Sequence, residues 1–232
     1  MSESRRSETV RHWMMIMALV LGPAVVTLSA AFILPLPTTD SVHDDFTAMI
    51  TNRPLLLISS LLEGVGFTIT LGGYAAIGQF LRRRGVTLAT IGAALCVVGI
   101  LGFGWAGATG FVLHALTGMT DHDAAFAAAQ AIASDPANSV SSMLEIVGPI
   151  GVLLLMLGLF RARIVPLWPV LVIIAGILAN GVIGTVVATF VADLLLLAGS
   201  TWVAVYLMRV RGPELTAEQG EPSELSGVAL RR

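Results

Sequence analysis

The stretch "LLLISSLLEGVGFTITLGGYAAIGQF", residues 55–80, is apolar along nearly its whole length and holds one charged residue, Glu63. A helix needs about 20 mostly apolar residues to cross the hydrocarbon core of a bilayer, and this stretch is longer than that. Three consecutive arginines, Arg82–Arg84, follow it almost directly. The pattern predicts a membrane-spanning helix that ends at a cytoplasmic surface.

The composition of the whole chain agrees with this interpretation. The 232 residues are 56% hydrophobic and 12% charged, with a mean hydropathy of +0.87, whereas a soluble domain is about 25% charged. The chain is therefore predicted to be an integral membrane protein. Its first apolar run, Trp13 to Leu34, is longer than the core of a signal peptide and ends at Pro35-Leu36-Pro37, so we expect a retained span.

The apolar runs predict an all-α, polytopic bundle of six membrane-spanning helices within a transmembrane domain, residues 13–210. The last two spans come from one long run, Ile164 to Met208, which Asn180-Gly181 and Gly184 divide by offering a turn. Residues 1–12 and 211–232 are expected to be a cytoplasmic N-terminal segment and a disordered cytoplasmic tail. The expected spans are about 13–34, 55–80, 86–116, 140–160, 164–183 and 186–208, with outer cap loops at 35–54 and 117–139.

Arginine placement predicts the orientation. With six spans, all arginines but Arg53 fall on one side, which indicates that both termini are cytoplasmic. The opposite side collects aspartates, and its two loops, 41–54 and 120–136, each begin with Asp and His and end at proline. We expect a short cap helix in each loop, N-capped by an acid. The cytoplasmic arginines are Arg5, Arg6, Arg11, Arg82–Arg84, Arg161, Arg163, Arg209, Arg211, Arg231 and Arg232, and the outer aspartates are Asp40, Asp44, Asp45, Asp121, Asp123 and Asp135.

An internal echo suggests that two helical hairpins are copies of each other. "SSLLEGVG", residues 59–66, and "SSMLEIVG", residues 141–148, agree at six of eight positions, and each follows a loop with a His-Asp pair. The echo predicts a duplicated hairpin, related by an axis along the membrane normal. The alternative is chance agreement in an apolar sequence, where only the Ser-Ser and Glu are informative.

Several polar side chains are expected at one depth, in the outer half of the membrane. With a rise of about 1.5 Å per residue, Glu63, Glu145 and Asp193 lie roughly 8 to 12 Å below the outer ends of their helices. A charge that faces lipid is unfavourable, so these groups should point into the bundle. We expect a pocket in which Glu63 and Glu145 are the main ion- or ligand-binding pair. Asp193, His114 and Asn180 are second choices, and the mouth is formed by His43, Asp44, His122 and Asp123.

Three functions are compatible with this pattern. In the first, an outward-facing acidic pocket binds a proton, cation or small solute for transport or sensing. In the second, the chain is a non-catalytic scaffold, regulatory protein or subunit of a larger complex. In the third, it is a membrane metal-binding protein or metalloenzyme that uses some of His43, His114, His122, Glu63 and Glu145. A homodimer is compatible with each.

The sequence holds no phosphate-binding loop, nucleophile elbow or HExxH spacing, so no motif requires a cofactor and an enzyme is the less favoured interpretation. The arginine clusters act as topology signals, and we expect the lipid bilayer, not nucleic acid, as the chain's surroundings.

The segment "GPIGVLLLMLGLFRARIVPLWPVLVIIAGIL", residues 148–178, resembles uncharacterised bacterial multi-pass membrane proteins. The shared pattern is an apolar helix, a short arginine-containing cytoplasmic turn, and Pro and Trp at the start of the next helix. The resemblance covers the fourth and fifth spans, implies a bacterial plasma-membrane location, and implies no activity.

Overall fold

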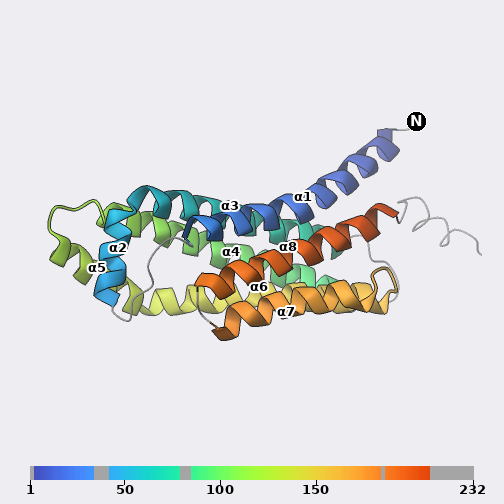
Figure 1. Ribbon diagram of the computed structural model, residues 1–232. Helices are drawn as coiled ribbons and strands as arrows, with labels where there is room; N and C mark the ends of the chain where they lie inside the picture. The colour runs from blue at the N-terminus through green and yellow to red at the C-terminus, as the bar shows by residue number, and fades with distance from the viewer. Residues whose placement is uncertain (1–2, 34–41, 79–84, 184–185, 210–232) are drawn as a thin grey trace, which may run out of the picture.

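The computed structural model describes residues 3–33, 42–78, 85–183 and 186–209, and within these ranges it contains eight α-helices and no strand (Figure 1). Six helices are long and run side by side, and two are short. The helices are α1 (Glu3–Ile33), α2 (Val42–Thr51), α3 (Arg53–Gly78), α4 (Val86–Leu116), α5 (His122–Ser134), α6 (Pro136–Arg161), α7 (Leu167–Ile183) and α8 (Val186–Arg209).

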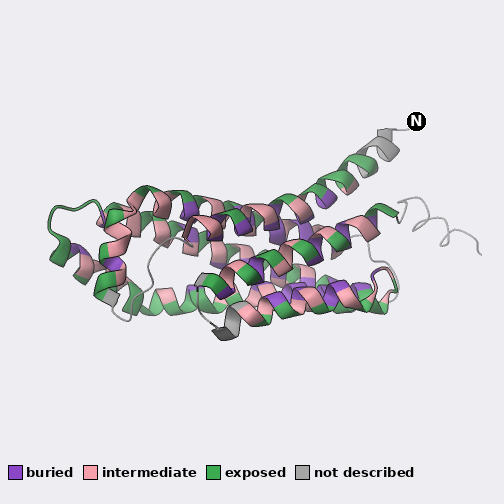
Figure 2. Cartoon of the chain, in the orientation of Figure 1, coloured by how far each residue is buried: buried purple, intermediate pink, exposed green. Residues whose placement is uncertain are grey.

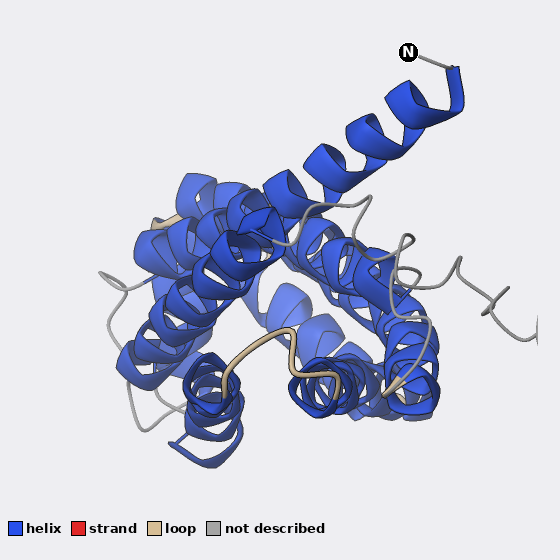
Figure 3. Ribbon diagram, turned by 90° about the vertical axis from the view of Figure 1, so that its right-hand side faces the viewer, coloured by secondary structure: helices blue, strands red, loops and turns tan. Residues whose placement is uncertain are grey.

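The six long helices form a ring in the order α1, α3, α4, α6, α7, α8, and α8 packs back on α1. Figure 3 views the bundle from one end, roughly along its helices. The ring is not uniform, because α6 packs much less closely on α7 than on α4. Buried residues lie on the inward faces, and exposed ones on the outer surface and on α5 (Figure 2).

The two ends of the ring differ in character. The short helices α2 and α5 lie at one end, which we name the cap end (Figure 1). The last turns of α6 and α8 lie at the other end, with Arg161 and Arg209, and we name it the arginine end. The two short cap helices expected from the loops are thus present, and Asp121 caps α5 by accepting a hydrogen bond from the Ala124 N–H at 3.0 Å, as predicted.

Five helices are long and apolar enough to cross a membrane, namely α1, α3, α4, α6 and α8. This is compatible with a multi-pass membrane protein. The expected fifth span, 164–183, is represented by the 17-residue helix α7. At about 1.5 Å per residue, α7 is roughly 25 Å long, a few ångströms less than a hydrocarbon core of about 30 Å.

Several expected boundaries differ from those of the helices. α1 begins at Glu3, so the helix extends through the N-terminal segment 1–12, while its candidate membrane span is Thr9–Ile33. Asn180-Gly181 does not form the expected turn, because α7 continues through both residues to Ile183. The loop expected at 117–139 ends early, since Asp135 caps α6 and Pro136 occupies its first turn, where the absent N–H is not needed. Gly184, Asp40, the cluster Arg82–Arg84 and the tail 211–232 lie outside the described residues.

Glycines set the close packing of the two large hairpins. In the α1–α3 hairpin, a Cβ on Gly66 would lie 2.8 Å from the Val26 nitrogen, and one on Gly73 would lie 3.2 Å from the Leu19 nitrogen. Any larger side chain at either glycine would push α1 and α3 apart. Small residues at such contacts are the usual way for helices to approach closely in lipid.

In the α4–α6 hairpin, a Cβ on Gly99 would collide with the Cα of Gly148, and one on Gly92 would lie 2.7 Å from the Leu155 nitrogen. Gly148 and Leu155 are seven residues apart, as are Gly66 and Gly73 in the other hairpin. Their partners on the facing helix are seven residues apart in both cases. The two hairpins therefore have the same helix register at the echoed octets.

Candidate functional site

Three carboxylates on three helices of the ring lie within electrostatic range of one shared member, Glu63. Glu63 on α3 interacts electrostatically with Glu145 on α6 and with Asp193 on α8. Asp193 is 5% exposed, and the two glutamates are half-buried. Among the described residues, no arginine or histidine forms an ion pair with any of the three. Three acids thus share one interior region without a basic partner.

A small cavity of about 70 Å³ lies in the same part of the ring, with walls from α3, α4, α6, α7 and α8. Asp193 and Thr70 supply its polar side chains, and Phe67, Phe103 and Pro149 are among its apolar ones. The Phe67 and Phe103 rings stack at 3.9 Å between centroids. Phe67 follows Glu63 by one helical turn, and Pro149 follows Glu145 by one turn. The cavity therefore lies one turn further from the cap end than the two glutamates.

Two further polar groups close to the glutamates lack the partners that a helix normally supplies. The Ser59 hydroxyl, one turn before Glu63, is on a residue that is only 1% exposed and has no hydrogen-bond partner in the described chain. On α6, Pro149 has no N–H, so the carbonyl oxygen of Glu145 cannot receive its usual helical hydrogen bond. Buried polar groups are normally satisfied, so the buried Ser59 hydroxyl is the one of the two that a bound water or ion would be expected to satisfy.

Asp193 is held in place through its own backbone. The Thr27 hydroxyl on α1 donates to the Asp193 carbonyl oxygen at 3.2 Å and to the Pro23 carbonyl oxygen at 2.9 Å. This contact joins α1 to α8 at the level of the acids. Thr27 was not among the residues expected from the sequence, because a threonine in an apolar run carries no distinguishing signal.

A second buried polar pair lies further toward the arginine end. The hydroxyls of Tyr74 on α3 and Ser200 on α8 are 2.5 Å apart, and both residues are fully buried. Tyr74 follows Thr70 by one turn, and Ser200 follows Asp193 by two turns. The sequence interpretation placed comparable polar groups only in the half with the carboxylates. The seven-residue spacing from Asp193 to Ser200 was the signal that could have revealed this pair.

His114, a second-choice site residue, makes contacts of a different kind. Its ring Nδ1 lies 3.2 Å from the Arg53 carbonyl oxygen, and the Arg53 Nε donates to the His114 carbonyl oxygen at 3.0 Å. These two hydrogen bonds tie the start of α3 to the end of α4. The structure therefore places His114 in a contact between helix ends at the cap end, and nothing brings it to the carboxylates.

The expected mouth residues lie on the two short helices. His43 packs edge-on against Phe126 of α5, with centroids 4.8 Å apart, and Phe46 lies 5.6 Å from the same ring. These contacts join α2 to α5 over the cap end. His122 and Asp123 are exposed at the start of α5, and Asp44 is exposed on α2. The side chain of Asn180 lies outside the description.

The metal hypothesis requires that some of five candidate ligands lie close together. These candidates are His43, His114, His122, Glu63 and Glu145. Within the described ranges, no group of three His, Cys, Asp or Glu side chains is placed to hold a metal ion. His43 and His114 instead contact Phe126 and Arg53, as described above.

No protein-family model, no curated protein and no solved structure matches this chain. The arrangement of side chains alone therefore has to carry any functional conclusion.

Proposed function

We propose that this chain is a bacterial plasma-membrane protein in which Glu63, Glu145 and Asp193 form an acidic site that takes up a proton, for transport or sensing; a small cation is the second candidate ligand, which the spacing of the three carboxylates favours less. The observation that carries the proposal is the interaction of Glu63 with both other acids. Like charges repel strongly away from bulk water, and no basic side chain of the described residues offsets this repulsion. A bound proton or cation would supply the missing positive charge.

The size and chemistry of the surroundings support a small ligand. One water molecule occupies about 30 Å³ in the liquid, so the cavity of about 70 Å³ has room for a few waters or a cation, but not for a larger solute. The Ser59 hydroxyl and the Glu145 carbonyl add uncharged oxygens beside the carboxylates. Oxygen atoms of these kinds suit protons, waters and hard cations.

For the surrounding topology, we propose six spans, with α7 as the fifth and shortest. The arginine end would face the cytoplasm, with both termini, and the cap end would face outward. The shared register of the α1–α3 and α4–α6 hairpins supports their origin by duplication of a long-short-long helix unit. In this arrangement the acidic site opens toward the outer, cap-end side.

The direct test is proton and cation binding by the purified protein in detergent. A pH-sensitive dye in weakly buffered solution would report proton release when Na⁺, K⁺ or Li⁺ is added, and an acid–base titration would count bound protons. We expect Glu63→Gln to abolish at least one titrating group and any cation-linked proton release, because Glu63 interacts electrostatically with both other acids. Glu145→Gln should have a smaller effect.

The matched control is Asp121→Asn, which neutralises an exposed acid that is not among the expected site or mouth residues and keeps a good N-cap for α5. It should leave cation-linked release unchanged. If Glu63→Gln behaves like Asp121→Asn, and wild-type stability depends on neither pH nor cations, the scaffold hypothesis replaces this one. If Glu63→Gln instead abolishes the proton release, a pH dye inside proteoliposomes would distinguish transport from sensing.

A further inference from the structure

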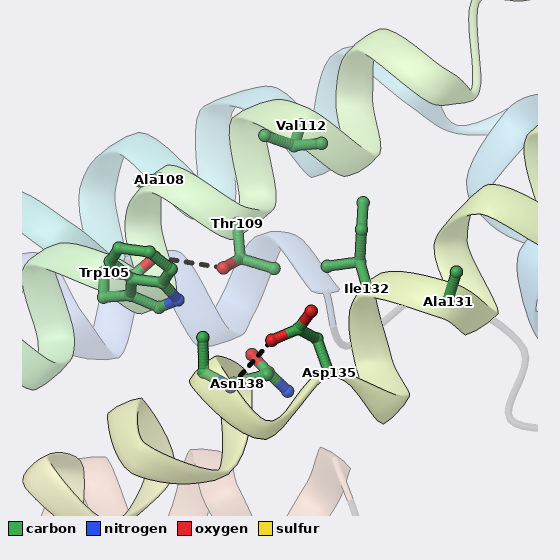
Figure 4. Close-up of a pocket in the computed structure, with 9 residues that line it drawn as sticks. Trp105, Ala108, Thr109, Val112, Ala131, Ile132, Asp135 and Asn138 are labelled. Carbon is green, nitrogen blue, oxygen red and sulfur yellow. Dashed lines mark hydrogen bonds between the residues drawn. The ribbon is translucent and has the colours of Figure 1, made fainter.

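A second and larger hollow lies at the cap end, away from the three carboxylates. It has a volume of about 510 Å³ and is bounded by α4, α5 and the beginning of α6 (Figure 4). Pockets of 300 to 1,000 Å³ with apolar walls and a few polar groups are typical of small-molecule sites. We name it the cap groove.

The walls of the cap groove combine apolar surface with one carboxylate. Trp105, Ala108 and Val112 line its α4 side, and Ile132 lines its α5 side. Asp135 stands at the other side, where Figure 4 shows its carboxylate between Thr109 and Asn138. One oxygen of Asp135, Oδ1, accepts a hydrogen bond from the Ala137 N–H at 2.7 Å. The other oxygen remains for a ligand.

The groove lies toward the cap-side membrane surface. Trp105 is 51% exposed, and tryptophan favours the boundary between hydrocarbon and headgroups. Val112, which also lines the groove, lies roughly 10 Å further along α4 toward the cap end.

We propose that the cap groove binds a membrane lipid whose headgroup carries a primary amine, from the leaflet on the cap side. The upper part of an acyl chain would lie against Trp105 and Ala108, and the amine would donate to the free oxygen of Asp135. Asp135 is the only charged residue lining the groove among those described, so an anionic headgroup without an amine is repelled. This inference does not rest on the acidic site.

The test uses the full chain in nanodiscs that contain a phosphatidylethanolamine with a photoreactive acyl chain. Peptide mass spectrometry maps the labelled residues, and unlabelled phosphatidylethanolamine or phosphatidylglycerol is added as competitor. We expect labelling on α4 and α5 around the groove, with phosphatidylethanolamine competing roughly two- to five-fold better, the range for one exposed charge pair.

Two variants separate the headgroup contact from the apolar contact. Asp135→Asn removes the charge but keeps a good N-cap for α6, so it should abolish the preference between competitors without unfolding the helix. Ala108→Trp fills the apolar part and should reduce labelling by the photoreactive phosphatidylethanolamine several-fold, whichever competitor is present. Asp123→Asn and Ala127→Trp, on exposed positions of α5 outside the groove, are the matched controls and should change neither.

Three results would overturn the proposal. Labelling spread evenly over the exposed faces of α6 and α7 would remove the site. Equal competition by the two lipids, unchanged in Asp135→Asn, would remove the amine recognition. Protection by free dodecylamine but not by phosphatidylethanolamine would assign the groove to a soluble amphipathic amine and not to a lipid.

Discussion

The α1–α3 and α4–α6 hairpins share an octet and a helix register, yet they differ in how they are joined to the rest of the ring. The first hairpin is linked to α8 by side-chain hydrogen bonds, from Thr27 to the Asp193 carbonyl and between Tyr74 and Ser200. The second packs on the first hairpin and only loosely on α7. Similar sequences therefore have different surroundings, and of the two echoed glutamates Glu63 is the one that interacts electrostatically with Asp193.

The register common to the two hairpins can be broken by adding side-chain volume at the glycine contacts. Gly99→Val and Gly66→Val should each lower the thermal midpoint in detergent by roughly 3 to 10 °C, because overpacking costs about 1–3 kcal/mol and each kcal/mol shifts a chain of this size by about 2–4 °C. A scanning fluorescence melt would measure this shift.

Matched positions exist on the same helices. A Cβ on Gly104 of α4 or on Gly72 of α3 would meet no atom within 4 Å. Valine at these two positions should therefore leave the midpoint within about 1 to 2 °C of wild type, since substitutions away from packing contacts change stability by about 0.5 kcal/mol or less. Equal destabilisation at all four positions would mean that helix propensity, and not the contact, sets the effect.

The sequence predicts much of this fold because membrane helices are encoded by composition. Apolar runs located the long helices, and the Asp-His loops located α2 and α5. The expectation that Glu63, Glu145 and Asp193 share one site rests on helix periodicity and on the cost of exposing a charge to lipid, and it stays a prediction. The Tyr74–Ser200 pair and the cap groove were not foreseen. The pair depends on how α3 and α8 face each other across α1, and the groove depends on how α5 lies between α4 and α6; a pattern within one helix specifies neither.

The two hairpins differ in how they are attached to α8, and one pair of equivalent positions allows this difference to be tested. Tyr74 on α3 corresponds in the echo to Met156 on α6, and both are fully buried, but only the tyrosine is hydrogen-bonded to α8. Tyr74→Phe should lower the thermal midpoint by roughly 2 to 4 °C, because a buried hydrogen bond contributes about 1 kcal/mol. Met156→Leu, which conserves volume, serves as the control.

A double-mutant cycle tests whether the Tyr74 and Ser200 hydroxyls stabilise each other. Tyr74→Phe combined with Ser200→Ala should cost clearly less than the sum of the two single changes, because both remove the same bond. Met156→Leu combined with Ser200→Ala should be additive. Additivity in the first cycle would show that the two hydroxyls do not stabilise each other.

The smallest expected change in stability distinguishes Ser59 from Ser141, its counterpart in the second octet. Ser141 donates to the Asn138 carbonyl at 2.9 Å, and this oxygen also accepts from Ser142, so Ser141→Ala should lower stability by about 0.5 kcal/mol. Ser59 has no partner among the described residues, so in the absence of a ligand Ser59→Ala should leave stability equal or raise it by up to about 1 kcal/mol.

Repeating the melts across pH and cation concentration would turn this contrast into a test of the acidic site. If a bound water or cation uses the Ser59 hydroxyl, Ser59→Ala should become destabilising under the conditions that fill the site, while Ser141→Ala should keep the same small effect throughout. A Ser59→Ala effect that never changes sign would separate this hydroxyl from the site and leave the three carboxylates as its only side-chain ligands. In that case the glutamates of the two echoed octets would serve binding, and the serines would serve only helix packing.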